Sequence, residues 1–225
     1  MIEAQDVSLQ YPDGTVALKP FSLFIGTGEL IYVTGPSGSG KTSLLQLLLG
    51  MVAPSTGLLS VLNQPMSGAR GADIRKLRRK VGPVFQEFRL TAGRSACENV
   101  MAGIRFLRPI PGPLKQEALE ALERVGLSHK AAAPIEHLSW GERQRVAIAR
   151  AIARKAELIL ADEPTGTLDK ENALIILSLL TSLRDEKTTV LITTHATHLL
   201  EPARASGIIR MENGRLDMIR EGAGR

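Results

Sequence analysis

The sequence contains little cysteine and few aromatic residues. It has one cysteine in 225 residues, and aromatic residues make up 4%. No disulfide can form within the chain, which excludes a disulfide-stabilised secreted scaffold and fits a reducing compartment. We expect the one cysteine, Cys97, to be a small buried apolar residue. The N-terminus also lacks the basic segment and apolar run of a signal peptide.

Long apolar runs are absent as well. No stretch approaches the roughly 18 residues that cross a bilayer. The most apolar stretch, Ala173 to Leu180, is interrupted by Ser178, and we predict a packed helix there. If the protein acts at a membrane, another chain must supply the membrane part. Hydrophobic residues still make up 44%, so the composition is that of a folded protein with a real core.

The net charge of +5 is compatible with anionic partners but does not identify one. Most basic residues are spread along the chain. One cluster runs from Arg75 to Lys80, and we interpret it as a solvated helix face in preference to a binding patch. We expect no nucleic-acid partner.

Apolar patterning predicts an α/β fold in a single domain, residues 1–225. Buried-strand signals alternate with helical ones, and a mostly helical insertion covers about residues 87–154. An Asn213-Gly214 turn predicts a hairpin near the end. The expected strands are 2–9, 16–25, 30–34, 158–161, 190–193, 208–211 and 216–219, and the clearest helices are 43–49, 116–125 and 144–155. The pattern predicts a parallel core with antiparallel additions.

A glycine-rich segment between a strand and a helix matches the G-x-x-x-x-G-K-[ST] pattern of a phosphate-binding loop. Its glycines let consecutive N–H groups point at phosphate oxygens, and the helix N-terminus adds positive potential. Lys41 is expected to reach the β- and γ-phosphates, and Thr42 to bind Mg²⁺. The predicted nucleotide-binding residues here are Gly35, Pro36, Ser37, Gly38, Ser39, Gly40, Lys41, Thr42 and Ser43.

An acidic pair follows the predicted strand 158–161. Asp162 is expected to lie beside Mg²⁺ at the end of that strand, and Glu163 to polarise the attacking water as a general base. An acidic pair after an apolar run is weak evidence alone. Together with the phosphate loop, it predicts an ATPase that uses ATP and Mg²⁺.

The segment from Leu138 to Arg145 reads Leu-Ser-Trp-Gly-Glu-Arg-Gln-Arg and precedes Asp162 by about 20 residues. It resembles the L-S-G-G-Q signature of the ABC ATPases, and this resemblance extends over essentially the whole chain. It implies a RecA-like P-loop NTPase core with a helical ABC subdomain. It also implies that Ser139, Gly141 and Glu142 bind ATP held by a second copy, so that the protein works as a homodimer.

The resemblance implies roles for four further residues. Tyr11 matches an aromatic that stacks on adenine, and Gln86 a glutamine that senses Mg²⁺ and the attacking water. Asp169 matches a loop that crosses the dimer interface, and His195 a histidine that contacts the γ-phosphate. Catalysis is thus assigned to Glu163 and His195 together with Gln86 and Lys41. The metal site is assigned to Thr42, Gln86 and Asp162.

One residue departs from the signature, because Trp140 replaces its first glycine. A glycine required for positive φ or close backbone approach would make this replacement harmful. The backbone N–H is kept, as are Ser139 and Gly141, so we expect activity to survive. His129, His137 and His198 show no metal-ligand spacing and are interpreted as structural.

Within the family, the motifs resemble those of the bacterial lipoprotein-releasing ATPase, the macrolide-exporter ATPase and the cell-division ABC ATPase. This implies a separate integral membrane permease as partner and a peripheral position on the cytoplasmic face of the inner membrane. It implies export, lipoprotein release or mechanotransmission as the task. Two alternatives stay open: a soluble, non-transport ABC ATPase, and a regulatory ABC complex that controls a cell-wall enzyme.

Overall fold

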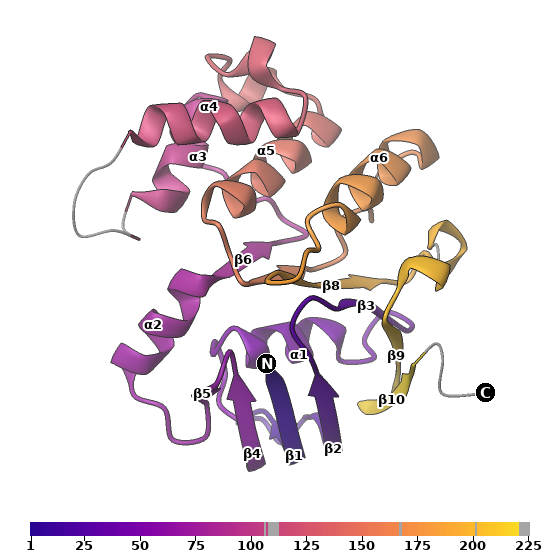
Figure 1. Ribbon diagram of the computed structural model, residues 1–225. Coiled ribbons are helices and arrows are strands. Elements are labelled where there is room, and N and C mark those ends of the chain that lie inside the picture. Colours follow the sequence, from indigo (N-terminus) through magenta and orange to yellow (C-terminus); the bar gives the residue numbers. More distant parts are fainter. Residues whose placement is uncertain (106, 108–112, 167, 201, 221–225) are drawn as a thin grey trace.

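The computed structural model describes residues 1–105, 107, 113–166, 168–200 and 202–220 (Figure 1). Part of the expected helical insertion, residues 106 and 108–112, lies outside the described residues, as does position 167 near Asp169.

A six-stranded sheet forms the centre of the molecule, in the order β10-β9-β3-β8-β7-β6. The strands from β9 to β6 are parallel, and β10 pairs antiparallel with β9. Every residue of β3, β7 and β8 is buried, which explains why β3 and β7 are almost wholly apolar; β8 has three apolar residues and three buried threonines. The strands are β3 (Leu30–Thr34), β6 (Val81–Val84), β7 (Leu158–Ala161), β8 (Thr189–Thr194), β9 (Gly207–Glu212) and β10 (Arg215–Ile219).

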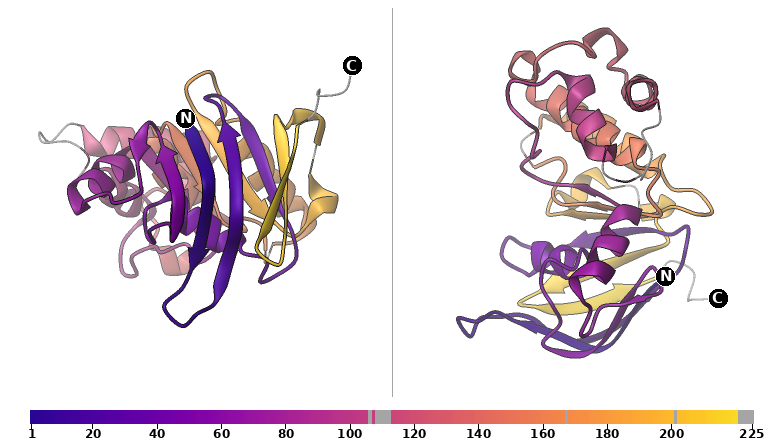
Figure 2. Two further views of the ribbon diagram at one scale, coloured as in Figure 1. Left: turned by 90° about the horizontal axis from the view of Figure 1, so that it is seen from below. Right: turned by 90° about the vertical axis from the view of Figure 1, so that its left-hand side faces the viewer.

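A second, antiparallel sheet lies on one side of the first, with α1 (Lys41–Leu48) between them (Figures 1 and 2). Its order is β2-β1-β4-β5. The leucines of α1 and the inner faces of both sheets share one hydrophobic cluster. The strands are β1 (Ile2–Gln10), β2 (Val16–Ile25), β4 (Thr56–Val61) and β5 (Gln64–Pro65).

Helices cover the opposite face of the central sheet (Figure 1). They share a second hydrophobic cluster with that face of the sheet. They are α3 (Ala96–Ile104), α4 (Leu114–Arg124), α5 (Trp140–Ala153) and α6 (Lys170–Thr181), while α2 (Gly71–Lys80) leads into β6. One-turn 3-10 helices occur at Ser128–Lys130, Ile135–His137, Thr197–Leu199 and Pro202–Arg204.

These elements confirm the predicted parallel core with antiparallel additions and a helical insertion. The hairpin β9–β10 turns at Asn213 and Gly214 as predicted. Cys97 is buried as expected, and burial raises the pKa of its thiol. The basic residues of α2 are exposed while Leu77 beneath them is buried, in agreement with a solvated helix face.

Several features differ from the prediction. Strands β4 and β5 were not among the expected strands, and α1 begins two residues before the expected helix 43–49. The helix expected over 144–155 begins four residues earlier, at Trp140, because Ser139 caps it with a side-chain hydrogen bond. Strand β6 was not predicted, because Gly82 and Pro83 within its four residues are unfavourable for a strand. In the part of the chain that the structure describes, no helix has the length and apolar character of a membrane span.

Candidate nucleotide-binding and catalytic site

The phosphate loop runs from the end of β3 to the first residue of α1. Gly40 occupies the N-cap of α1 at φ 104°, a region that other residues rarely adopt. A Cβ on Gly40 would lie 2.7 Å from the Ala17 carbonyl oxygen, so both the conformation and the space require glycine here. The loop closes on itself through the Ser39 amide, which donates to the Pro36 carbonyl at 3.2 Å.

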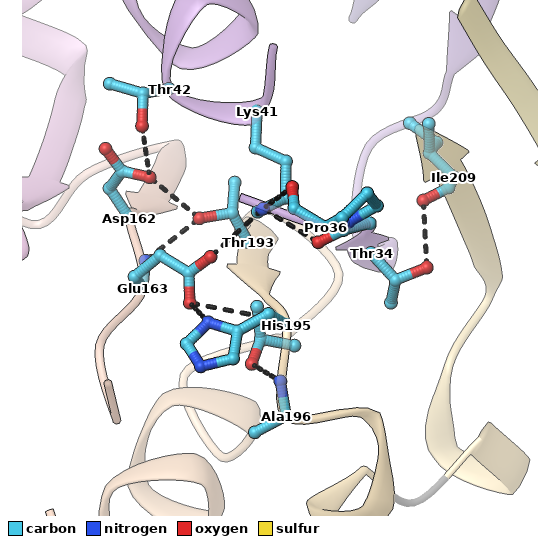
Figure 3. A network of polar contacts seen from close by, with 12 residues as sticks. Thr34, Pro36, Lys41, Thr42, Asp162, Glu163, Thr193, His195, Ala196 and Ile209 are labelled. Carbon is cyan, nitrogen blue, oxygen red and sulfur yellow. Dashed lines mark hydrogen bonds and ion pairs between the residues drawn. The ribbon is translucent and has the colours of Figure 1, made fainter. Parts of the chain in front are cut away.

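The Lys41 side chain is buried and turned back over this loop (Figure 3). Its ammonium donates to the carbonyl oxygens of Gly35 and Pro36, each at 2.9 Å. It also forms an ion pair with Glu163, with 3.2 Å from Nζ to Oε1. The phosphate loop and the acidic pair therefore meet through one side chain.

Asp162 follows β7 and is held by two hydroxyl groups (Figure 3). Thr42 Oγ1 donates to Asp162 Oδ1 at 3.3 Å, and Thr193 Oγ1 donates to the same oxygen at 2.8 Å. Thr193 is fully buried on β8, and its hydroxyl also accepts from the Glu163 amide at 2.9 Å. One threonine thus positions both acidic residues, and no motif in the sequence pointed to it.

Glu163 and His195 form a close pair at the ends of neighbouring strands. The imidazole Nδ1 lies 2.8 Å from Glu163 Oε2, and the His195 amide donates to the same oxygen at 3.3 Å. The Glu163 side chain is only 10% exposed, whereas that of His195 is 58% exposed. Glu163 has φ 43°, a strained conformation for a non-glycine residue.

A cavity of about 870 Å³ lies over the phosphate loop. Tyr11 lines one end, and its hydroxyl is within hydrogen-bonding distance of Ser43 Oγ and Gln46 Oε1, each at 3.1 Å. The hairpin turn at Asn213 and Gly214 also lines it, although the sequence suggested only a turn there. The lining residues are Tyr11, Thr15, Val16, Ala17, Pro36, Ser37, Gly38, Gly40, Lys41, Thr42, Ser43, Gln86, Glu163, His195, Asn213 and Gly214.

Gln86 lies in the segment after β6 and lines two cavities. One is the cavity over the phosphate loop. The other, about 250 Å³, is also lined by Thr42 and Asp162. The three residues assigned to the metal site from the sequence therefore share this second cavity.

Ser139 and Glu142 use their side chains to begin α5. Ser139 Oγ accepts from the Glu142 amide at 3.3 Å, and Glu142 Oε2 accepts from the Ser139 amide at 2.8 Å, which forms a capping box. Lys130 pairs with Glu142 at 2.6 Å. The hydrogen bond from Lys130, followed by the one from the Ser139 backbone, lowers the pKa of the Glu142 carboxyl.

Trp140 and Gly141 occupy the first turn of α5, where their amide groups have no partner within the helix. Trp140 has ordinary negative φ, so replacing the family glycine causes no backbone strain. A Cβ on Gly141 would lie 3.2 Å from Asn172 Oδ1, a tight contact that Asn172 would have to relieve by a small shift. The first turn of α5 is thus intact despite the substitution.

Asp169 caps α6. Its Oδ1 accepts from the Asn172 amide at 2.9 Å, and its Oδ2 accepts from the Asn172 side chain at 2.7 Å. These hydrogen bonds, the backbone one first, lower the pKa of the Asp169 carboxyl. Since Asn172 also approaches Gly141, the Asp169 cap and the first turn of α5 are neighbours.

The structure therefore divides the predicted site residues into two groups. The first surrounds the phosphate loop and includes Lys41, Thr42, Asp162, Glu163 and His195. The second, at the starts of α5 and α6, does not line the cavity over that loop. It consists of Ser139, Gly141, Glu142 and Asp169.

Comparison with known proteins gives one consistent family. The family model described as ABC transporter matches residues 18–166. The cell division ATP-binding protein FtsE of Streptococcus pneumoniae is 37% identical over 96% of this chain and 94% of its own. The same protein of Mycobacterium tuberculosis is 38% identical over 96% and 94%.

Similar solved structures come from the same family. A dimeric ATP-binding cassette in a post-hydrolysis state, bound to ADP and phosphate, has a TM-score of 0.89 at 33% identity and covers 98% of each chain. The cbiO1 protein of Clostridium perfringens, described as part of an ABC transporter complex, has a TM-score of 0.86 at 30% identity, with 96% and 86% covered.

Proposed function

The chain belongs to the ABC transporter family of ATP-hydrolysing, nucleotide-binding proteins, and we propose that two copies close head-to-tail over two ATP molecules. In this homodimer the phosphate loop of each copy faces Ser139 and Gly141 of the other. The observation that carries the proposal is the division of the site residues into two groups. Each chain has a phosphate loop with Glu163 beside it, while its capped α5 N-terminus, suited to bind an anion, lies outside that cavity.

Magnesium fits the residues present. Thr42 and Asp162 present oxygen atoms 3.3 Å apart, and Gln86 lines the same small cavity. Oxygen ligands suit Mg²⁺, which takes few protein ligands and completes its shell with water and phosphate. We assign Thr42 and Asp162 as its ligands and Gln86 as the residue that senses it. When bound, the ion neutralises charge that develops on the phosphates.

In this mechanism the chain's own residues position and activate the reacting groups. Lys41 leaves its loop carbonyls to bind the β- and γ-phosphates, while Tyr11 packs on the adenine. Glu163 accepts a proton from the attacking water, and His195 orients the Glu163 carboxylate and contacts the γ-phosphate. Asp169 faces the second copy across the interface, and residues 1–225 act as one nucleotide-binding domain. The tighter binding of ATP to the closed dimer supplies the work.

We propose an integral membrane permease as the partner, with the ATPase peripheral on the cytoplasmic face of the inner membrane. The partner surface is the segment around Arg89, where a cavity of about 340 Å³ is lined by Met51, Phe85, Arg78 and Arg154. The Arg89 guanidinium lies 3.9 Å from the Phe85 ring centroid, so the cavity combines apolar side chains with the charges of three arginines. The task is export, lipoprotein release or transmission of force.

Similarity to cell-division ATP-binding proteins favours one more specific candidate. It is a regulatory complex in which ATP-driven closure controls a cell-wall enzyme through the permease. In both a regulatory complex and an exporter, this chain would carry out the same ATP hydrolysis. The permease would determine the cargo or the target.

The test is to identify what co-purifies with the tagged Glu163→Gln variant. The variant should bind Mg·ATP, lose turnover and accumulate as a closed dimer, which size-exclusion chromatography detects. Mass spectrometry of detergent-solubilised membranes should then recover a permease with a large extracytoplasmic domain. Wild-type protein without nucleotide is the control. Recovery of only soluble or nucleic-acid partners would overturn the membrane proposal, and wild-type turnover in the variant would overturn the role of Glu163.

A further inference from the structure

The only tryptophan of the chain contacts the segment that carries Gln86. The Trp140 ring lies against that of Phe88, with centroids 4.2 Å apart and planes at 66°. Edge-to-face pairs of this kind stabilise beyond the area that they bury. The Trp140 side chain is otherwise 40% exposed, so this contact connects two surface elements. It joins the first turn of α5 to a residue only two positions after Gln86.

Hydrogen bonds also attach this segment to the helical layer. The Arg150 guanidinium donates to the carbonyl oxygens of Phe88 and Arg89, each at 2.7 Å. Burial, and then the charges of Arg154 and Arg89, lower the pKa of Arg150 to about 10, so it is still a cation at neutral pH. These bonds come from the last turn of α5, about three turns from Ser139. The Trp140–Phe88 contact instead connects the segment to the turn that Ser139 caps.

We propose that Trp140 is a positioning residue that makes the place of Gln86 depend on the first turn of α5. The inference rests on the proposed function, in which that turn faces the nucleotide of the second copy. A nucleotide bound against Ser139 and Gly141 then moves Phe88 and, with it, Gln86 in the other site of the dimer. The Trp140–Phe88 pair couples the two sites, so hydrolysis in one responds to occupancy of the other.

Trp140 replaces a glycine of the family signature, so the proposed coupling depends on a residue that departs from that signature. The signature has glycine at this position, and glycine has no side chain to reach Phe88. Since Trp140 introduces no positive φ and leaves the Ser139 cap intact, its ring is an addition to the turn and not a defect in it.

Kinetics of four variants test the coupling. Trp140→Gly restores the family residue and removes the contact, and Phe88→Leu removes it from the other side. Each should lower kcat about three- to tenfold and bring the Hill coefficient close to one, with KM for ATP little changed. Trp140→Phe and Phe88→Tyr keep two rings in contact and should retain most of the wild-type rate. Phe24→Leu, on the exposed face of β2, is a matched control and should leave kcat and the Hill coefficient unchanged.

A double variant and fluorescence complete the test. Trp140→Gly with Phe88→Leu should lose no more activity than either alone, because both remove one interaction. The Trp140 emission is a direct probe, since no other tryptophan contributes. Mg·ATP should shift it in a Glu163→Gln background, and Phe88→Leu should reduce that shift.

Wild-type kinetics in both single variants, or additive losses in the double variant, would overturn the coupling while leaving the ATPase assignment standing. Circular dichroism identifies a variant that fails to fold. If Phe88→Leu fails to fold, Trp140→Gly still tests the coupling, because Trp140 is at an exposed position. Absence of turnover in the wild-type protein would refute the proposed function, and the inference with it.

Discussion

His195 holds the carboxylate of Glu163 from two directions at once. Its ring Nδ1 lies 2.8 Å from Oε2, and its own amide donates to that oxygen at 3.3 Å. The amide contact belongs to the backbone and persists in any variant, whereas the ring contact is lost when the side chain is removed. The ring is therefore the part of His195 that mutation can test.

We expect His195→Ala to lower kcat about a hundredfold or more, because the carboxylate loses the group that orients it. ATP affinity should fall far less than kcat, since the phosphate loop is untouched and only the His195 contact with the γ-phosphate is lost. Steady-state turnover and equilibrium titration with a fluorescent ATP analogue measure the two quantities. His198→Ala, an exposed histidine three residues further on, should behave like the wild type. Equal turnover in both variants would remove His195 from the mechanism.

Thr193→Val should reduce both stability and activity. The Thr193 hydroxyl donates to Asp162 and accepts from the Glu163 amide, so its loss leaves that amide without this acceptor and Asp162 with only the Thr42 hydroxyl. The free energy of unfolding should fall by about 1–3 kcal/mol in urea titrations. Thr189→Val is the control: this threonine is equally buried on β8 and bonds to Gly26 and Gly28, away from the site. It should lose similar stability but keep its turnover rate.

Gly40→Ala should weaken ATP binding about tenfold or more, because the new Cβ meets the Ala17 carbonyl and distorts the phosphate loop. The left-handed conformation adds about 1–2 kcal/mol of strain to the folded state. Gly68 also has positive φ, 71°, but nothing within 4 Å of an added Cβ, so Gly68→Ala should show backbone strain without the clash. Isothermal titration with Mg·ATP measures the ATP affinity of both variants. Equal affinity in the two would contradict the steric argument.

Glu142→Gln should make the free energy of unfolding less dependent on pH in the acid range. The folded-state pKa of Glu142 lies below its unfolded value. Its carboxylate therefore stabilises the fold above the unfolded pKa, and this stabilisation is lost as pH falls through the folded pKa. Glutamine keeps an acceptor for the Ser139 amide but cannot pair with Lys130 as an ion.

At neutral pH the free energy of unfolding of the wild type should exceed that of Glu142→Gln by about 0.2–1 kcal/mol. This difference should vanish in acid. Urea titrations across this range measure it. Glu123→Gln, at an exposed position of α4, should show no such trend. A gap between wild type and Glu142→Gln that persists unchanged in acid would mean that the Lys130 ion pair contributes nothing.

Much of the fold could be predicted from short, strong local signals. The strand 30–34 is apolar throughout because both of its faces are buried, and the glycine pattern after it fits a phosphate loop. Strand β6 could not be predicted, because Gly82 and Pro83 are accommodated only by the tertiary structure. Helix α5 was placed too late because its first turn contains Trp140 and Gly141, poor helix formers that a cap makes acceptable.

The site was predictable where residues are adjacent in the sequence. Lys41 and Thr42 belong to one motif, and Asp162 and Glu163 directly follow one strand. Thr193 could not be found in this way, since its importance comes from β7 and β8 being neighbours. The Trp140–Phe88 contact joins residues 52 positions apart, and no local pattern reports it.

The turn between β9 and β10 has a consequence for how the protein is made. Its Gly214 amide donates to the Ser39 carbonyl in the phosphate loop, so residues far apart in the sequence complete one cavity. Strand β3 likewise pairs with β8 and β9, both from the last part of the chain. During synthesis from the N-terminus, the glycine-rich loop emerges long before its partners. A nascent chain should therefore have no complete ATP cavity until its final fifty residues are free to fold, which makes nucleotide binding a late event in biogenesis.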